Sequence, residues 1–490
     1  MAALLTTMVL LHGYPCLSIA QSINESDEVE SKTQNDDTPP NVTVARDEPV
    51  SERLDAVVAH MQYLTEHSYD QVGKVSTPMW LSKIDIRSNG LPKSREAGDP
   101  RRNAGASSGA SLFWDQPSLV AAYELSQRTG CKCYTDAAQA YTQAYIDACL
   151  DGQSGMLWWG SDHEYDVVED SIVGPDGDDR RTYLPRTPGW ETMWLIDRSV
   201  VERQIRSMSE IHDTDPSLAL APDWVLIDSV CWLAAQDASD RQSLLNQAWE
   251  VARARFKTRH PDTGLITTAA IVADQVDAES TTELGVWAMS LLRAAQQSRS
   301  QAFQNMADEA ISRWLFNGYD SDAGKYYRSI EVASRTPIRG ANQSSGWHAE
   351  VFVPDGTQNP NHAMPMAETC LSLFDLTGKQ IYQESVERWV AQIEASLPAN
   401  QGHGAHAEDY GRVIHFLVRA SIVMDEPRYR ALAESVAQEA MKVLYEPKLG
   451  MFRSHPGEDV CESVDGPGYL LLALLSLEGS NTEFESALHF

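Results

Sequence analysis

The segment Tyr469-Leu470-Leu471-Leu472-Ala473-Leu474-Leu475 is apolar on every face of the helix that it predicts. A helix at the surface of a soluble protein has an apolar stripe and a polar face, whereas a helix that is apolar all round is buried. We therefore expect this segment to lie in an inner layer that other helices cover. Helical periodicity predicts helices at 51–67, 114–127, 134–150, 190–208, 240–256, 280–297, 302–316, 363–376, 381–396, 407–423, 428–445 and 466–477.

The links between these helices are alternately short and long. Short links such as 128–132 and 377–380 join antiparallel neighbours, and they alternate along the chain with long loops such as 151–189 and 317–362. Six helical hairpins connected in this way bring every long loop to one end. The pattern predicts an all-α fold, an (α/α)6 toroid with inner and outer helix rings and a cleft at the loop end. A helical solenoid is the alternative, and 209–239 is expected to be a long, partly irregular link.

Acidic residues dominate the charge balance. The chain has 70 Asp and Glu against 39 Lys and Arg, for a formal net charge of −31. Such a surface repels phosphate backbones and anionic membranes, so nucleic acid is not an expected partner. It also disfavours a polyanionic substrate unless cations or a metal gather in the cleft. After the N-terminus, no run approaches the roughly 20 apolar residues that span a bilayer.

The N-terminal segment predicts export. Residues 1–20 contain an apolar run and small residues at a plausible cleavage point, which is typical of a signal peptide. Residues 21–50 are polar and acidic and cannot bury enough apolar surface to offset the entropy of ordering, so we expect a disordered linker. The toroid catalytic domain is expected at 51–480, followed by a C-terminal tail at 481–490, in a secreted or periplasmic protein.

The cysteines define neither a zinc site nor a disulfide framework. Cys131-Lys132-Cys133 is the one clustered pair, and it lacks a companion pair at zinc-ribbon spacing. Disulfides are compatible with an exported chain, with a connectivity that the sequence leaves open. Buried free thiols are the alternative.

The stretch Gly155-Met156-Leu157-Trp158-Trp159-Gly160-Ser161-Asp162-His163-Glu164-Tyr165-Asp166 combines tandem tryptophans with a histidine and acidic side chains. The indoles of Trp158 and Trp159 offer stacking faces for a sugar, and His163, Glu164 and Asp166 offer protons or metal ligands. In the alternative, the tryptophans fill a core and the acids face water. If the long loops converge, they add the substrate-binding candidates Trp347, His348 and Arg328.

A second candidate group is Gly404-Ala405-His406-Ala407-Glu408-Asp409-Tyr410-Gly411-Arg412, at the start of a predicted inner helix. Arg412 would neutralise a substrate carboxylate, and His406 or Tyr410 would exchange protons with the substrate. Glu408 and Arg412 lie four residues apart on one helical face, so a simple ion pair is the alternative. The catalytic candidates are His406, Glu408, Tyr410, Arg412 and Asp166.

Parts of the chain resemble the periplasmic pectate lyases and related toroid proteins. The His163-Glu164-Tyr165-Asp166 segment is similar to the metal-side histidine loop of that family, and Pro188-Gly189-Trp190-Glu191-Thr192-Met193-Trp194 is similar to the segment with its metal-binding glutamate. The resemblance implies that His163 and Glu191 are ligands of a divalent cation, Ca²⁺ or Mn²⁺. The family also has a catalytic arginine–histidine pair, whereas here His212 follows Glu191 without a preceding arginine.

These features predict an exported enzyme that cleaves an acidic, pectate-like polysaccharide or oligosaccharide by β-elimination. Such a lyase neutralises the uronate carboxylate, abstracts the proton at C5 and protonates the leaving oxygen. A glycoside hydrolase of the six-hairpin type is the alternative, with paired carboxylates such as Asp166 and Glu408. A sugar epimerase with two facing histidines and a non-enzymatic glycan-binding toroid are further alternatives. The oligomeric state stays open.

Overall fold

A computed structural model describes residues 51–88, 90–92, 109–161, 163–174, 184, 186–214, 221–236, 238–267, 278–322, 324–338, 347–348 and 364–479. Contacts within the chain separate residues 1–49 from a compact unit at 50–490, and the description below concerns this second unit. The predicted signal peptide, linker and C-terminal tail lie outside the described residues. No helix in the described ranges is long and apolar enough to cross a membrane.

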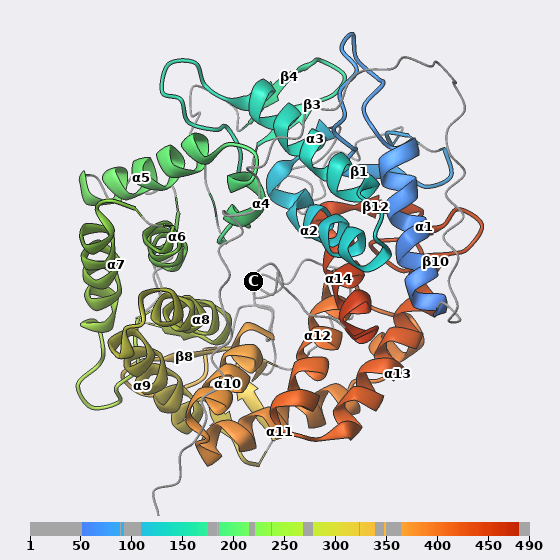
Figure 1. Ribbon diagram of the computed structural model, residues 1–490. Helices are drawn as coiled ribbons and strands as arrows, with labels where there is room; N and C mark the ends of the chain where they lie inside the picture. Colours follow the sequence, from blue (N-terminus) through green and yellow to red (C-terminus); the bar gives the residue numbers. More distant parts are fainter. Residues whose placement is uncertain are drawn as a thin grey trace, which may run out of the picture. The chain divides into compact units, whose positions relative to one another are not determined.

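The helices alternate along the chain between inner and outer positions (Figure 1). The inner helices are α2 (Leu112–Thr129), α4 (Trp190–Trp194), α6 (Asp223–Ala235), α8 (Thr281–Ser298), α10 (Met364–Thr377), α12 (Ala407–Val423) and α14 (Pro467–Leu477). The outer helices are α1 (Glu52–His67), α3 (Cys133–Cys149), α5 (Arg198–Thr214), α7 (Arg241–Phe256), α9 (Gln301–Asn317), α11 (Gln380–Ala395) and α13 (Pro427–Leu444).

The contacts between helices confirm the predicted all-α toroid. α14 packs against both α12 and α2, α10 packs against α12 and α8, and α8 packs against α6. Outer helices α3, α7, α9, α11 and α13 each pack against the inner helix that precedes them in the chain. Almost every residue of α14 is buried, as its apolar sequence predicts for an inner helix.

Two stretches differ from the sequence prediction. The helix expected at 190–208 is two helices, because α4 ends at Trp194 and the carboxylate of Asp197 caps the start of α5. That carboxylate accepts hydrogen bonds from the backbone N–H groups of Ser199 and Val200, at 2.8 and 3.2 Å. The link expected at 209–239 contains α6, an inner helix that is buried over most of its length.

The short helix α4 connects α2 to α6 within the ring. The backbone N–H of Gly189, which directly precedes α4, donates a hydrogen bond of 3.0 Å to the side chain of Gln116 on α2. On the other side, the indole N–H of Trp190 donates to the hydroxyl of Ser229 on α6 at 2.9 Å. These two bonds close the inner ring where the regular hairpin pattern is interrupted.

Glycines allow the inner helices to approach one another closely. A Cβ atom added at Gly468 of α14 would lie 2.4 Å from the backbone nitrogen of Ser118 on α2. A Cβ atom added at Gly411 of α12 would lie 2.5 Å from the backbone carbonyl carbon of Tyr469 on α14. Real Cβ atoms do not approach backbone this closely, so α14 reaches both of its neighbours because these two positions lack a side chain.

Short antiparallel strands tie the long loops together near the first residues of the inner helices. β2 and β5 directly precede α2 and α8, and β12 precedes α14 with a short 3-10 helix, Ser463–Asp465, between them; these strands pair with β3, β8 and β1. The strands are β1 (Lys83–Asp85), β2 (Gly109–Ala110), β3 (Glu164–Asp166), β4 (Ser171–Val173), β5 (Ala278–Ser280), β6 (Tyr319–Asp320), β7 (Lys325–Tyr327), β8 (Ser329–Glu331), β9 (Trp347–His348), β10 (Tyr445–Glu446), β11 (Met451–Phe452) and β12 (Val460–Glu462).

Candidate active site

Two arginines flank one tyrosine near the start of the last inner helix. Arg186, in the loop before α4, donates a hydrogen bond of 2.7 Å from Nη1 to the hydroxyl of Tyr469 on α14. The guanidinium carbon of Arg186 lies 5.5 Å from the centroid of the Tyr469 ring, and that of Arg412 on α12 lies 4.7 Å from it. Cations within about 6 Å of an aromatic face are attracted to it. Tyr469 therefore holds both arginines together.

Glu408 completes this group. The Nη2 atom of Arg412 lies 2.6 Å from a carboxylate oxygen of Glu408, and Nε donates to the same oxygen at 2.7 Å. A Cβ atom added at Gly466 would lie 2.6 Å from Cβ of Glu408 and 2.9 Å from the ring of Tyr469, which places Glu408 next to that ring. We call Arg186, Glu408, Arg412 and Tyr469 the Tyr469 cluster.

The cluster has a buried layer and an accessible layer. The Tyr469 residue is 1% exposed and the Arg412 side chain 8% exposed, whereas the Glu408 side chain is 26% exposed and Arg186 is half-buried. A ligand can therefore contact Arg186 and Glu408 directly. Tyr469 and Arg412 lie beneath them and fix their positions.

The buried layer keeps its protons at neutral pH. Burial is the largest single influence and lowers the pKa of Arg412, but Glu408, Tyr469 and Glu368 together outweigh it, and the net shift of the pKa is upward. Burial raises the pKa of Tyr469, although the two arginines oppose that shift. Arg412 therefore stays a cation and Tyr469 a neutral phenol.

Trp114, near the start of α2, adds an aromatic surface to the cluster. Its indole N–H donates to the backbone carbonyl of Ser161 at 3.1 Å, which fixes the ring. The guanidinium of Arg186 lies 4.6 Å from the centroid of the Trp114 ring. Because Trp114 is only half-buried, part of its surface is available beside Arg186 and Glu408. An aromatic surface, a cation and a carboxylate together suit a saccharide that carries an acid group.

A second group of polar side chains lies between α4, α6 and α8. Arg293 of α8 forms a buried ion pair of 2.8 Å with Asp228 of α6. Glu191, in the first turn of α4, is half-buried beside them. These residues contribute to a small pocket that is lined by Thr187, Pro188, Trp190, Glu191, Asp228, Trp232, Arg293 and Gln297.

His406 lies next to the Tyr469 cluster along the chain, at the N-cap of α12. It is 5% exposed, and its ring centroid lies 4.5 Å from that of His455. The backbone N–H of Ala407 donates to the carbonyl of Ser454 at 2.9 Å, which holds the loop with His455 against the start of α12. His406 is therefore buried, and its ring contacts the half-buried ring of His455.

Three of the predicted site residues have structural roles. Trp159 is fully buried and packs against Phe113 and Trp190, so the prediction that it stacks on a sugar is wrong. Tyr410 is also fully buried, and its hydroxyl donates to Glu439 on α13, away from the Tyr469 cluster. The Asp166 carboxylate accepts from the backbone N–H groups that follow β3 and so stabilises a turn.

The remaining predicted binding residues are placed only in part. Trp158 and Arg328 are half-buried, and burial lowers the pKa of Arg328. Trp347 and His348 form β9, which pairs with β7, and their side chains lie outside the described residues.

The predicted metal ligands, His163 and Glu191, lie in different surroundings. His163 is 2% exposed and lies against Gly174, where an added Cβ would be 2.8 Å from its ring. Glu191 faces the second pocket. Within the described ranges, no group of three or more His, Cys, Asp or Glu side chains is arranged to hold a metal ion. The divalent-cation site at His163 and Glu191 therefore stays a prediction.

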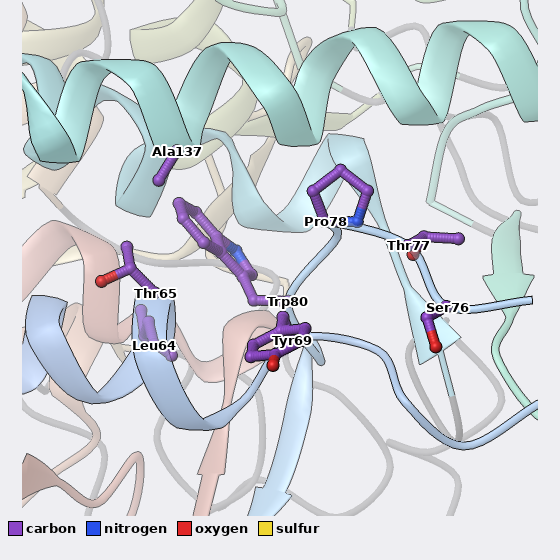
Figure 2. Close-up of a pocket in the computed structure, with 8 residues that line it drawn as sticks. All are labelled: Leu64, Thr65, Tyr69, Ser76, Thr77, Pro78, Trp80 and Ala137. Carbon is purple, nitrogen blue, oxygen red and sulfur yellow. The ribbon is translucent and has the colours of Figure 1, made fainter. Parts of the chain in front are cut away.

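A pocket of about 400 Å³ lies outside the helical ring, between α1, α3 and the loop after α1 (Figure 2). The indole of Trp80 stands between Leu64 and Pro78 in this view. The lining contains no carboxylate, histidine or arginine, so it offers neither the cations nor the carboxylate of the Tyr469 cluster. It is formed by Leu64, Thr65, Tyr69, Ser76, Thr77, Pro78, Trp80 and Ala137.

No protein-family model and no curated relative matches the sequence. Among solved structures, a cellobiose 2-epimerase from Bacillus thermoamylovorans is 9% identical, with a TM-score of 0.48 over 88% of this chain and 98% of the other. An α-1,6-mannanase from Salegentibacter sp. HEL1_6 is 10% identical, with a TM-score of 0.45 over 87% and 99%. An unsaturated glucuronyl hydrolase from Bacillus sp. GL1 is 15% identical, with a TM-score of 0.41 over 75% and 97%.

Arg186 and Tyr469 belong to the candidate site, but no pattern in the sequence predicts them. Tyr469 begins the apolar run of α14, where an aromatic residue is expected for packing alone. Arg186 lies in a long loop with no recognisable motif. The position of Tyr410 in the sequence argues against its predicted proton exchange at this site, because residues two apart on a helix point in nearly opposite directions. Tyr410 therefore cannot share a face with both Glu408 and Arg412.

Proposed function

We propose that the protein is an enzyme that binds a uronic acid unit of a saccharide at the Tyr469 cluster and cleaves the adjoining bond by β-elimination. One observation carries the proposal: in a chain of net charge −31, two arginines converge on one tyrosine beside a partly exposed carboxylate. An arginine in such a position binds a carboxylate well, because its planar group donates two parallel hydrogen bonds.

In this proposal Arg186 binds the uronate carboxylate, and Trp114 packs against the sugar ring. Neutralising the carboxylate makes the proton at C5 more acidic. Glu408, held by Arg412, takes that proton, the bond between C4 and the leaving oxygen breaks, and a C4–C5 double bond forms. The leaving oxygen receives a proton from solvent or from protonated Glu408. Tyr469 is a positioning residue in this scheme, because it holds Arg186 without contacting the substrate.

The experiment is an incubation of the purified protein with polygalacturonate, alginate and glycosaminoglycans. Elimination yields an unsaturated sugar that absorbs ultraviolet light, and we expect this absorbance to grow with at least one substrate. Saturated reducing ends without absorbance would instead indicate hydrolysis by paired carboxylates. Binding without any product would indicate a glycan-binding protein. Either of these results would overturn the lyase proposal.

A second candidate is hydrolysis, which the pocket between α4, α6 and α8 favours. Glu191 and Asp228 both line that pocket, and two carboxylates are the usual requirement of a glycoside hydrolase. Asp228 forms a buried ion pair with Arg293, which fixes the position of its carboxylate in the pocket. The same incubation separates the two candidates by the products that form.

A further inference from the structure

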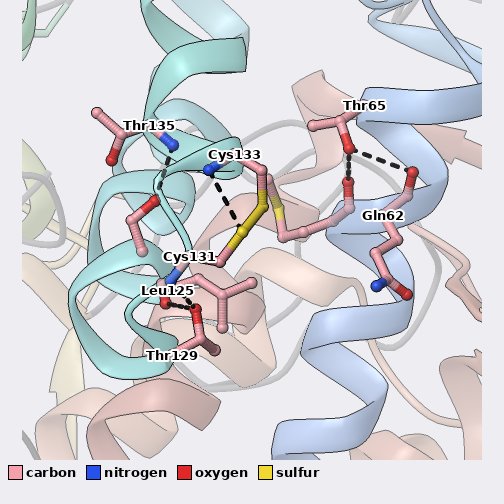
Figure 3. Close-up of a disulfide and its surroundings, with 9 residues drawn as sticks. Gln62, Thr65, Leu125, Thr129, Cys131, Cys133 and Thr135 are labelled. Atoms are coloured by element: carbon pink, nitrogen blue, oxygen red, sulfur yellow. Dashed lines mark hydrogen bonds between the residues drawn. A yellow bond between two sulfur atoms is a disulfide. The ribbon is translucent and has the colours of Figure 1, made fainter. Parts of the chain in front are cut away.

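Two cysteines outside the candidate active site form a disulfide across a single residue. Cys131 and Cys133 are bonded in the turn between α2 and α3, facing α1 (Figure 3). Cys133 is the first residue of α3 and is exposed, Lys132 between them is exposed, and Cys131 is half-buried. A small thiol can therefore reach Cys133 in the folded protein.

This disulfide constrains the unfolded chain very little. The stabilisation that a disulfide gives through chain entropy grows with the length of the loop that it closes. Here the two cysteines are two positions apart, which is close to the shortest loop possible. Helices α2 and α3 already pack against each other on either side of the turn. The disulfide therefore contributes little to the stability of the fold, and α2 and α3 remain packed against each other when it is reduced.

The local structure stabilises the thiolate that reduction would release. The backbone N–H of Cys133 donates a hydrogen bond of 3.4 Å to the sulfur of Cys131. N–H groups at the start of a helix have no partner within the helix, and they carry partial positive charge. Lys132, the exposed residue between the two cysteines in the chain, adds a positive charge to this turn. Thiolates at helix N-termini and next to cations are stabilised and become good leaving groups.

We propose that the Cys131–Cys133 disulfide is a redox-active site that exchanges with small thiols of the glutathione class while the protein remains folded. A thiolate attacks the exposed sulfur of Cys133, the bond between the two cysteines breaks, and Cys131 leaves as a thiolate on the Cys133 N–H. A second thiol then attacks the mixed disulfide and releases Cys133. Two thiols are oxidised to one disulfide, and the protein gains two electrons and two protons.

The other described cysteines cannot take part in this exchange. Cys149, Cys231, Cys370 and Cys461 are all buried, and none of them forms a disulfide with another described cysteine. Burial raises the pKa of Cys149 and that of Cys370 to about 12, which leaves almost no reactive thiolate at neutral pH. An external thiol therefore exchanges with the Cys131–Cys133 disulfide, and the buried cysteines do not compete with it.

The test uses the full chain in buffers with different ratios of reduced and oxidised glutathione. After acid quenching and alkylation, mass spectrometry measures the oxidised fraction of the pair, and circular dichroism measures the fold. We expect a reversible two-electron titration with an unchanged helical signal and a mixed disulfide on Cys133. A bond that glutathione reduces only after denaturant has unfolded the protein would overturn the proposal. A mixed disulfide found on Cys131 would overturn the assigned direction of attack.

Two variants sharpen the test. Cys131→Ser leaves Cys133 without its partner, and we expect it to form a stable mixed disulfide with oxidised glutathione in the folded protein. Cys149→Ser changes a buried thiol in the same helix and should leave the titration of the pair unchanged. If Cys131→Ser resists glutathione as completely as the buried cysteines do, Cys133 is not accessible and the proposal fails.

Discussion

The guanidinium of Arg186 and the hydroxyl of Tyr469 are joined by a hydrogen bond of 2.7 Å, although 283 positions separate them in the sequence. The bond forms because the loop before α4 and the start of α14 meet where the helical ring closes. It fixes a cation beside the accessible carboxylate of Glu408. The proposed activity depends on this relationship, since a mobile arginine would bind a substrate carboxylate less well.

Removal of the Tyr469 hydroxyl should weaken substrate binding more than turnover. In Tyr469→Phe the ring remains under the two arginines, but Arg186 loses the acceptor that orients it. We expect KM to rise roughly 5- to 10-fold, which corresponds to the loss of one ordinary hydrogen bond, with a smaller effect on kcat. Tyr429→Phe, which removes a buried hydroxyl from outer helix α13, is the control and should change neither constant. Equal effects of the two variants would contradict a positioning role for Tyr469.

Neutralising Glu408 should affect turnover. Glu408→Gln keeps an oxygen that accepts from Arg412 but cannot take a proton from the substrate. We expect kcat to fall on the order of 100-fold or more, the usual contribution of a general base. Glu434→Gln on α13, where an exposed side chain forms a weak ion pair with Arg430, is the matched control. Steady-state kinetics on both variants measure this, and a Glu408→Gln enzyme with full kcat would exclude Glu408 as the base.

The close approach of α14 and α2 should be intolerant of any side chain at Gly468. In Gly468→Ala the new methyl group would lie 2.4 Å from backbone of α2, so the two helices must separate. Overpacking of this kind costs about 1–3 kcal/mol, and backbone gives way less readily than side chains. Gly152→Ala has nothing within 4 Å of the added Cβ and serves as the control. Thermal melts should show a lower Tm for Gly468→Ala and an unchanged Tm for Gly152→Ala. Equal Tm values for the two variants would contradict the close packing of α14 against α2.

Buried Asp115 should make stability depend on pH. Burial raises the pKa of this carboxyl to about 6, even though hydroxyls of Ser82, Tyr141 and Ser463 and the backbone N–H of Ser111 donate to it. Its ordinary value is 3.8, so between about pH 4 and pH 6 the folded protein binds more protons than the unfolded chain. The free energy of unfolding therefore falls as pH rises through this window, by roughly 3 kcal/mol from this group, and then levels.

Other carboxyls titrate in the same range, so the contribution of Asp115 is isolated by a variant. The pKa values of Asp197 and Asp240 are lowered, chiefly by side-chain hydrogen bonds, and these groups give the opposite slope. We expect urea unfolding of the protein and of Asp115→Asn at several pH values to differ by an amount that changes between pH 4 and pH 6. A difference that stays constant over that range would show that Asp115 does not titrate there.

The sequence predicts most of the ring because burial leaves a clear pattern. An inner helix such as α14 must be apolar on all faces, and that pattern is visible without a structure. Sequence patterns do not predict α6, because its apolar run is short and periodicity alone does not separate it from a buried strand. The split between α4 and α5 depends on the side-chain cap at Asp197, which propensity does not reveal.

The candidate site was predicted in part. Glu408 and Arg412 are four residues apart, and helical geometry alone places them on one face, where the structure has them paired. Arg186 and Tyr469 are brought together only by the closure of the ring, and no local pattern carries that information. Residue type alone does not distinguish a tryptophan that stacks on a sugar from one that fills the core: Trp159 is fully buried, and Trp158 is half-buried.

The most direct measurement compares kcat/KM for polygalacturonate and for its methyl ester, in the unchanged protein and in Arg186→Gln. The ester has no negative charge for Arg186 to bind. We expect the unchanged protein to prefer the free acid, and Arg186→Gln to lose that preference through a roughly 10- to 100-fold fall on the acid alone, as for a hydrogen bond to a charged group. Arg203→Gln, at a surface arginine bonded to the carbonyl of Gly155, should keep the preference. An Arg186→Gln enzyme that still prefers the acid as strongly would contradict the assignment of Arg186 as the carboxylate-binding residue.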